Sequence, residues 1–136
     1  MLSPVALLTA FAALTAAAPM ADQSPAEPRG LLSGQLTWYT EGMGVSATAC
    51  GTVHQVTEHI AALSPADYGT YANPNDSPVC GKHIRIHGSN GNSVVAKVVD
   101  RCAGCTGHNV DVTPVVFTTL GFTEAVGRVE MSWQFI

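Results

Sequence analysis

Residues 98–117, VVDRCAGCTGHNVDVTPVVF, contain the features that decide the fold of this chain. The segment Ser93–Asp100 leads into this stretch and places small apolar residues on one face with the period of two that is typical of a β-strand. A Cys/Gly-rich loop follows over residues 101–109, and Val110–Val112 is again extended. Thr113-Pro114 then opens a short helix, because proline suits the first helical position. This order of elements indicates a compact, mainly β domain.

The rest of the chain repeats short β patterns separated by turns. Asn90-Gly91 joins two alternating segments, which is a strong hairpin signal. Ser64-Pro65 opens a second helical turn. Trp133 shares one face of the last strand with other apolar residues, so we expect it in the core. The other predicted strands are Gln35–Thr40, His59–Leu63, His83–His87 and Arg128–Phe135. About six short strands without a βαβ rhythm predict a small closed barrel or a sandwich.

The N-terminal part of the chain reads as a leader and a linker. Ala6–Ala18 is apolar and Ala-rich, and its length suits the hydrophobic region of a signal peptide but not a membrane-spanning helix. A buried core helix is the alternative, but the sequence offers no second apolar helix to pack against it. We therefore expect a signal peptide over residues 1–21 and a linker or short pro-segment over residues 22–30, rich in proline and charge. The folded domain is expected over residues 31–136.

The surface composition limits the possible partners. From residue 31 onward the chain has five lysines and arginines and eight aspartates and glutamates, a net charge of −3. No basic run is present, so we expect no nucleic-acid partner. No phosphate loop, nucleotide fingerprint or nucleophile elbow occurs either. Asn75-Asp76-Ser77 is a glycosylation sequon in a polar loop. We expect a secreted, extracellular monomer without a membrane partner.

Four cysteines lie in the predicted domain: Cys50, Cys80, Cys102 and Cys105. An even number in a secreted chain indicates disulfides, which help to stabilise a domain with a limited core. Of the three possible pairings, we favour Cys50–Cys80 with Cys102–Cys105. Cys102 and Cys105 with His108 also suit a redox or zinc site, but zinc needs further ligands. A structural disulfide is the more common role in secreted chains, so we expect no metal and no cofactor.

Four pieces of sequence, in a fixed order, carry a resemblance to a known family. They are GQLTWY at residues 34–39, ACG at residues 49–51, VVDRCAGC at residues 98–105 and VDVTPVVF at residues 110–117. Together they resemble the loosenins, which are fungal single-domain relatives of the expansins, and the first domain of expansins and rare lipoprotein A. The resemblance covers nearly the whole predicted domain. It implies a six-stranded double-psi β-barrel with short helical turns.

The resemblance also implies a site. The acidic residue that expansins need for wall loosening falls on Asp111, a second acid falls on Asp100, and a hydroxyl of the first strand falls on Thr37. Plant expansins have His-Phe-Asp at this acid, whereas His108 lies three residues before Asp111 here. Expansins also carry a second, carbohydrate-binding domain with exposed aromatics. Its absence from this sequence implies weaker substrate binding.

The chemistry of two nearby carboxylates supports this reading independently. Their repulsion keeps a proton on one of them to higher pH, so a protonated Asp111 can donate to a glycosidic or hydroxyl oxygen. Hydrolysis also needs a base that activates water, a role open to Asp100 only if it faces the groove. Plain structural roles remain open as well. Asp111 can cap a helix, Asp100 can accept from loop amides, and Thr37 can be ordinary strand surface.

Aromatic residues are candidates for stacking on sugar rings, because an aromatic face combines apolar area with a polar handle. The candidates are Trp38, Tyr39, Tyr68 and Tyr71. Trp38 and Tyr39 are adjacent in a predicted strand, so one of the two points inward and only the other can serve.

Three functions follow from the residues and the resemblance. The first, which we favour, is a non-hydrolytic, expansin-like protein that binds and loosens cell-wall polysaccharide, either chitin or cellulose. The second is a secreted cysteine-protease inhibitor or effector, because some single-domain barrels of this group bind such proteases. The third is a lytic enzyme that cleaves polysaccharide with Asp100 and Asp111.

Overall fold

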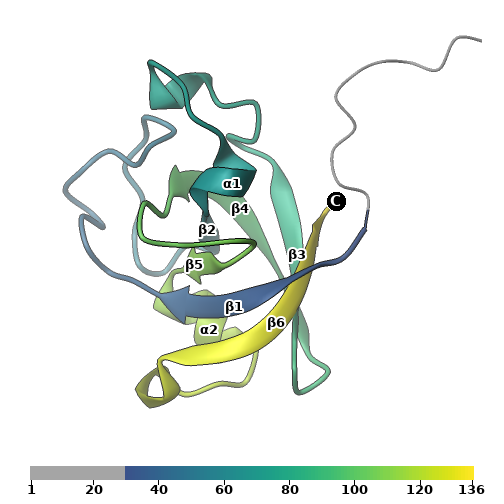
Figure 1. Cartoon of the computed structure of the whole chain (residues 1–136). Coiled ribbons are helices and arrows are strands. Elements are labelled where there is room, and N and C mark those ends of the chain that lie inside the picture. The colour runs from purple at the N-terminus through teal and green to yellow at the C-terminus, as the bar shows by residue number, and fades with distance from the viewer. Residues whose placement is uncertain (1–29) are drawn as a thin grey trace, which may run out of the picture.

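The computed structural model describes residues 30–136, and the strands of this region close into a barrel (Figure 1). The predicted signal peptide over residues 1–21 and the predicted linker up to residue 29 lie outside the described residues. The strands are β1 (Leu32–Trp38), β2 (Ile60–Leu63), β3 (His83–Gly88), β4 (Ser93–Arg101), β5 (Val110–Val112) and β6 (Arg128–Phe135). Around the barrel their order is β1-β5-β2-β4-β3-β6. The predicted fold class, a mainly β, six-stranded double-psi barrel with short helical turns, is confirmed.

The pairing around β2 brings distant segments of the chain together. β2 pairs antiparallel with β5 and parallel with β4, and β5 pairs parallel with β1. Ala62 of β2 is therefore the register partner of Asp111 on one side and of Asp100 on the other. Thr37 of β1 is the partner of Asp111 on its far side. Thr37, Asp111, Ala62 and Asp100 form one row across four neighbouring strands, which we call the acidic row.

The first strand begins earlier than the sequence predicts. We expected it from Gln35 to Thr40, whereas β1 runs from Leu32 to Trp38. Its early residues have little β pattern of their own, but they pair antiparallel with β6, where Leu32 lies opposite Trp133. Pairing with a long partner strand thus extends β1 toward the N-terminus, because the ladder satisfies its backbone groups.

Two helical turns lie where the sequence predicts them. They are α1 (Pro65–Tyr68) and α2 (Pro114–Thr119), and each begins with a proline that pre-sets the helical backbone. Two single 3-10 turns, η1 (Pro74–Asp76) and η2 (Glu124–Val126), lie in connecting segments. Within residues 30–136, no helix has the length and apolar character needed to cross a membrane.

The core consists of apolar side chains from alternating strand positions, closed by residues of α2. Trp133 is fully buried, so its predicted place in the core is confirmed. Its indole Nε1 donates to the backbone oxygen of His108 at 2.9 Å, which satisfies the one polar atom of the ring. Its ring also meets Phe135 edge-on, with centroids 5.2 Å apart. Other fully buried residues are Leu36, Leu63, Ile84, Ile86, Val98, Val110, Val112, Phe117 and Leu120.

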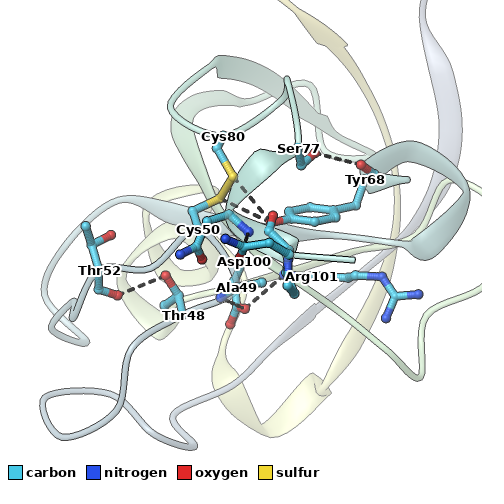
Figure 2. Close-up of a disulfide and its surroundings, with 12 residues drawn as sticks. Thr48, Ala49, Cys50, Thr52, Tyr68, Ser77, Cys80, Asp100 and Arg101 are labelled. Atoms are coloured by element: carbon cyan, nitrogen blue, oxygen red, sulfur yellow. Dashed lines mark hydrogen bonds between the residues drawn. A yellow bond between two sulfur atoms is a disulfide. The ribbon is translucent and has the colours of Figure 1, made fainter. Parts of the chain in front are cut away.

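Both favoured disulfide pairings are present. Cys50–Cys80 joins residues that are 30 positions apart, and Cys102–Cys105 joins residues that are 3 apart. The Tyr68 hydroxyl lies 3.6 Å from Cys50 Sγ and 3.3 Å from Cys80 Sγ (Figure 2). Because Cys102 and Cys105 are bonded to each other, neither is a free thiol that could ligate zinc.

Candidate functional site

The acidic row lies in a cavity of about 440 Å³, which we call the acidic groove. Its walls come from the segment after β1, from β2 and β5, and from the end of β4 with the loop that follows it. Its lining residues are Tyr39, Glu41, Ala62, Asp100, Arg101, Cys102, Ala103, Gly104 and Asp111. The structure therefore brings Asp100 and Asp111 to one cavity, as the resemblance predicts, and it holds Thr37 against that cavity through Asp111.

Asp111 is a half-buried carboxyl group that lines the groove. The Thr37 hydroxyl Oγ1 donates to Asp111 Oδ1 at 2.9 Å. Burial raises the pKa of Asp111 above its ordinary value, and the charge of Asp100 raises it further. The Thr37 hydrogen bond and the Arg128 charge act in the opposite direction. We predicted that the proximity of the two carboxylates would raise the pKa of one of them, and the Asp100 charge does raise the pKa of Asp111. Desolvation by burial is the larger cause.

The plain alternatives for Asp111 and Thr37 are not what the structure shows. Asp111 lies within β5, and the N-cap position of α2 belongs to Thr113, so Asp111 does not cap that helix. Thr37 is not ordinary strand surface, because its hydroxyl donates a hydrogen bond to Asp111.

Asp100 is tied down by three donors. Its Oδ1 accepts from the backbone amides of Ala49 and Arg101, each at 2.9 Å (Figure 2). Its Oδ2 accepts from the Tyr39 hydroxyl at 3.0 Å. Asp100 therefore accepts from loop amides, which is the structural role that the sequence left open for it. Burial and the neighbouring Asp100 charge raise the pKa of Tyr39, which keeps its hydroxyl protonated as a donor.

The prediction that four aromatic residues are candidates for stacking on sugar rings is partly wrong. Tyr68 is 1% exposed, and its hydroxyl donates to the Pro74 carbonyl oxygen at 2.6 Å, so its ring is part of the core and cannot stack on a sugar. The sequence does not predict the burial of Tyr68, because α1 is too short for its pattern to show which face is buried. Trp38 is half-buried against the core, and its Nε1 donates to the Glu124 carbonyl oxygen at 3.0 Å. Of the adjacent pair, Tyr39 is the one that reaches the groove.

A second, smaller cavity lies beside the acidic groove. Its volume is about 100 Å³, and it is lined by Tyr68, Gly69, Thr70, Tyr71, Pro74 and Arg101. We call it the tyrosine cavity. Tyr71 is 40% exposed, so its ring remains accessible for stacking. Arg101 lines both cavities. No pattern in the sequence marks Arg101 as a site residue, although it directly follows Asp100 at the end of the predicted strand.

The neighbouring polar residues have other partners. His108 Nδ1 lies 2.9 Å from Asp67 Oδ1, and the Asp67 side chain also accepts from the Ser64 hydroxyl at 3.1 Å. Among residues 30–136, no three His, Cys, Asp or Glu side chains gather as metal ligands would. Asn75 is exposed in η1, and its glycosylation stays a prediction.

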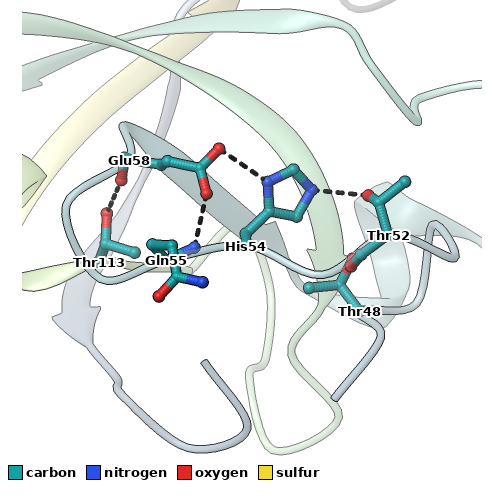
Figure 3. A network of polar contacts seen from close by, with 6 residues as sticks. All are labelled: Thr48, Thr52, His54, Gln55, Glu58 and Thr113. Carbon is teal, nitrogen blue, oxygen red and sulfur yellow. Dashed lines mark hydrogen bonds and ion pairs between the residues drawn. The ribbon is translucent and has the colours of Figure 1, made fainter. Parts of the chain in front are cut away.

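A long loop between β1 and β2 projects from one side of the barrel (Figure 1). His54 organises it: Nδ1 lies 3.1 Å from Glu58 Oε1, and Nε2 lies 2.6 Å from the Thr52 hydroxyl (Figure 3). The other Glu58 oxygen accepts from the Gln55 amide. The loop also exposes three valines: Val45 at 82%, Val53 at 51% and Val56 at 39%. Polar contacts thus hold this loop over residues 39–59, and its outer surface carries apolar side chains; we call it the braced loop.

Comparison with known proteins gives a consistent set of relatives. The family model described as Kiwellin-1 matches residues 35–135. The allergen Asp f 7 homolog of Arthroderma benhamiae is 36% identical over 118 residues, which covers 76% of this chain and 38% of that protein. Kiwellin of Actinidia chinensis var. chinensis is 38% identical over 107 residues, covering 68% of this chain and 47% of that protein. This chain therefore spans less than half the length of these two relatives.

Three further matches cover a larger share of the matched protein. The papain inhibitor of Streptomyces mobaraensis is 28% identical over 107 residues, covering 77% of this chain and 71% of that protein. The solved Streptomyces papain inhibitor superposes with a TM-score of 0.70 at 28% identity, covering 82% of this chain and 99% of that one. An expansin of Clavibacter michiganensis, also solved as a variant with cellohexaose, superposes at 0.64 with 23% identity, covering 79% of this chain and 50% of that one. The expansin likeness shows a shared fold.

Proposed function

This chain belongs to the kiwellin family, and from that premise we propose that it is an extracellular protein that binds cell-wall polysaccharide, chitin or cellulose, in the acidic groove and loosens it without hydrolysis. Two disulfides suit an oxidising, extracellular setting. An open groove with convergent polar groups is the usual form of a small-ligand site.

One observation carries this proposal: a half-buried carboxyl, Asp111, with a raised pKa in an accessible cavity. A carboxyl that keeps its proton is a hydrogen-bond donor as well as an acceptor. It can donate to the glycosidic or hydroxyl oxygens that hold neighbouring glycan chains together. Such a competing hydrogen bond separates glycan chains without breaking a covalent bond. Loosening is therefore strongest at the pH values at which Asp111 is protonated.

The state of Asp100 supports loosening rather than cleavage. A general base must accept a proton from water through a free lone pair. Both Asp100 oxygens already accept from Ala49, Arg101 or Tyr39. These three donors hold the Asp100 carboxyl group against the protein, so Asp100 organises the groove wall. In the lytic alternative, water would have to compete with these donors for the second carboxylate of the acidic row.

The test is an insoluble-polysaccharide pull-down with chitin and with cellulose, coupled to a loosening assay and a reducing-end assay. Wild-type protein should bind at least one polymer and loosen it without new reducing ends. Asp111→Asn should abolish loosening, because the amide keeps the shape but its N–H is a weaker hydrogen-bond donor than the O–H of a carboxylic acid. Asp76→Asn, an exposed acid in η1, is the matched control and should behave as wild type. New reducing ends, or full loosening by Asp111→Asn, would refute the proposal.

A second candidate function is inhibition of a cysteine protease. The papain inhibitor named above is similar to this chain over almost its whole solved length, and the braced loop supplies a surface that suits insertion into a protease cleft. Rigid loops bind with a smaller loss of conformational entropy. Papain activity should fall on addition of the chain, and Val45→Ser with Val53→Ser should relieve that inhibition. Val126→Ser, which is 56% exposed outside this loop, is the control. Undiminished papain activity with excess wild-type chain would eliminate this candidate.

A further inference from the structure

Arg101 has a charged side chain without a partner. Within residues 30–136 its guanidinium makes no hydrogen bond and no ion pair, and its Nε is a buried nitrogen with no acceptor. Its backbone amide donates to Asp100 Oδ1 at 2.9 Å. In Figure 2 the side chain extends away from the Asp100 carboxylate, and no dashed line reaches the guanidinium.

Leaving the Arg101 guanidinium without an acceptor costs free energy. Guanidinium is always charged in proteins, and its five donors are fixed in a planar fork. A buried donor without an acceptor retains its full desolvation cost, so each case calls for an explanation. The acceptor that best matches this fork is a carboxylate, which binds it through two parallel hydrogen bonds.

The position of Arg101 indicates the shape of the missing ligand. Arg101 lines both the acidic groove and the tyrosine cavity. A ligand that contacts Arg101 from the groove is therefore next to Tyr71, whose ring is 40% exposed. An exposed tyrosine ring beside an arginine suits a sugar that carries an acid, because the ring stacks on the apolar face of the sugar and the arginine binds its charge.

We propose that Arg101 binds the carboxylate of a uronic acid, which gives the chain a second class of ligand: an acidic wall polysaccharide that runs from the acidic groove to Tyr71. This inference rests on the proposed function for the groove and extends it beyond neutral glycans. The acids of the groove leave room for such a ligand. Asp111 has a raised pKa, the Asp100 charge is matched by three donors, and Glu41 is exposed, so that solvent screens its charge.

The experiment compares binding to polygalacturonate with binding to its fully methyl-esterified form, at constant ionic strength. The wild-type chain should prefer the free acid by about tenfold or more, the amount that a charge-assisted hydrogen bond provides. Arg101→Gln should remove this preference, and Arg101→Lys should keep only part of it, because lysine has charge without the fork. Arg85→Gln, an exposed arginine of β3, should keep the full preference. Thermal unfolding of each variant checks that it is folded.

Two additional arms separate the possible failures. Equal binding to polyglutamate would show that the sugar is not recognised and would overturn the uronate assignment, as would an equal loss of preference in Arg85→Gln. Tyr71→Ala should weaken binding to both forms of polygalacturonate, because stacking does not depend on the acid. Wild-type binding to chitin or cellulose with no preference for polygalacturonate would refute this inference and leave the proposed function intact. The reverse pattern would refute the proposed function alone.

Discussion

Removal of the Cys50–Cys80 bridge should destabilise the barrel more than removal of the Cys102–Cys105 bridge. The first joins residues 30 positions apart and the second joins residues 3 apart. A crosslink lowers the entropy of the unfolded chain by an amount that grows with the logarithm of the loop it closes. With these separations as loop lengths, the relation gives about 3.6 kcal/mol for Cys50–Cys80 and about 1.6 kcal/mol for Cys102–Cys105.

Packing acts in the same direction as the chain entropy. Cys50 and Cys80 pack against the hydrophobic core, and both sulfurs contact the hydroxyl of the buried Tyr68. Truncating them to alanine removes these contacts and leaves a small void, which adds to the loss of stability. The Cys102–Cys105 bridge lies in the loop after β4, outside that cluster.

The assay is urea unfolding of two double variants, Cys50→Ala with Cys80→Ala and Cys102→Ala with Cys105→Ala, beside the wild-type chain. The first variant should lose about 2 kcal/mol more in the free energy of unfolding than the second. An equal loss in the two variants, or a larger loss for Cys102 and Cys105, would refute the reasoning. It would mean that native-state packing of the loop after β4, and not unfolded-chain entropy, sets the contribution of each bridge.

Further predictions concern the polar contacts of the barrel. Burial raises the folded pKa of Asp111, so the wild-type chain should lose stability when this group ionises as pH rises from strongly acidic to neutral. The free energy of unfolding of Asp111→Asn should therefore rise relative to that of wild type over this range. A pH series of urea unfolding curves measures this difference, and a constant difference would contradict the prediction. Tyr39→Phe should cost about 1.5 kcal/mol in the same assay, because Asp100 Oδ2 loses its donor. Asp67→Ala should destabilise more than His108→Ala, since the Asp67 side chain is 7% exposed and that of His108 is 43% exposed; equal losses would show that the pair acts as one unit.

Local sequence pattern was sufficient for much of the architecture. Alternation places Ile84, Ile86 and Trp133 inside, and the proline-led turns begin where α1 and α2 begin. These features are local because the side-chain period of a strand and the backbone angle of proline are properties of a few adjacent residues. The motif around Asp100 and Asp111 also indicated the two acids of the groove, and both line it.

Only the tertiary structure decided what lies opposite each of these residues. Asp100 and Asp111 share one groove because β2 inserts between β4 and β5, and the shift at Ala61 and Ala62 sets their register. The burial of Tyr68 and the missing partner of Arg101 have no signature in local pattern. A residue's own neighbours determine which face of a strand it occupies, but its environment depends on strands that pair from distant parts of the chain, and local periodicity contains no information about that pairing.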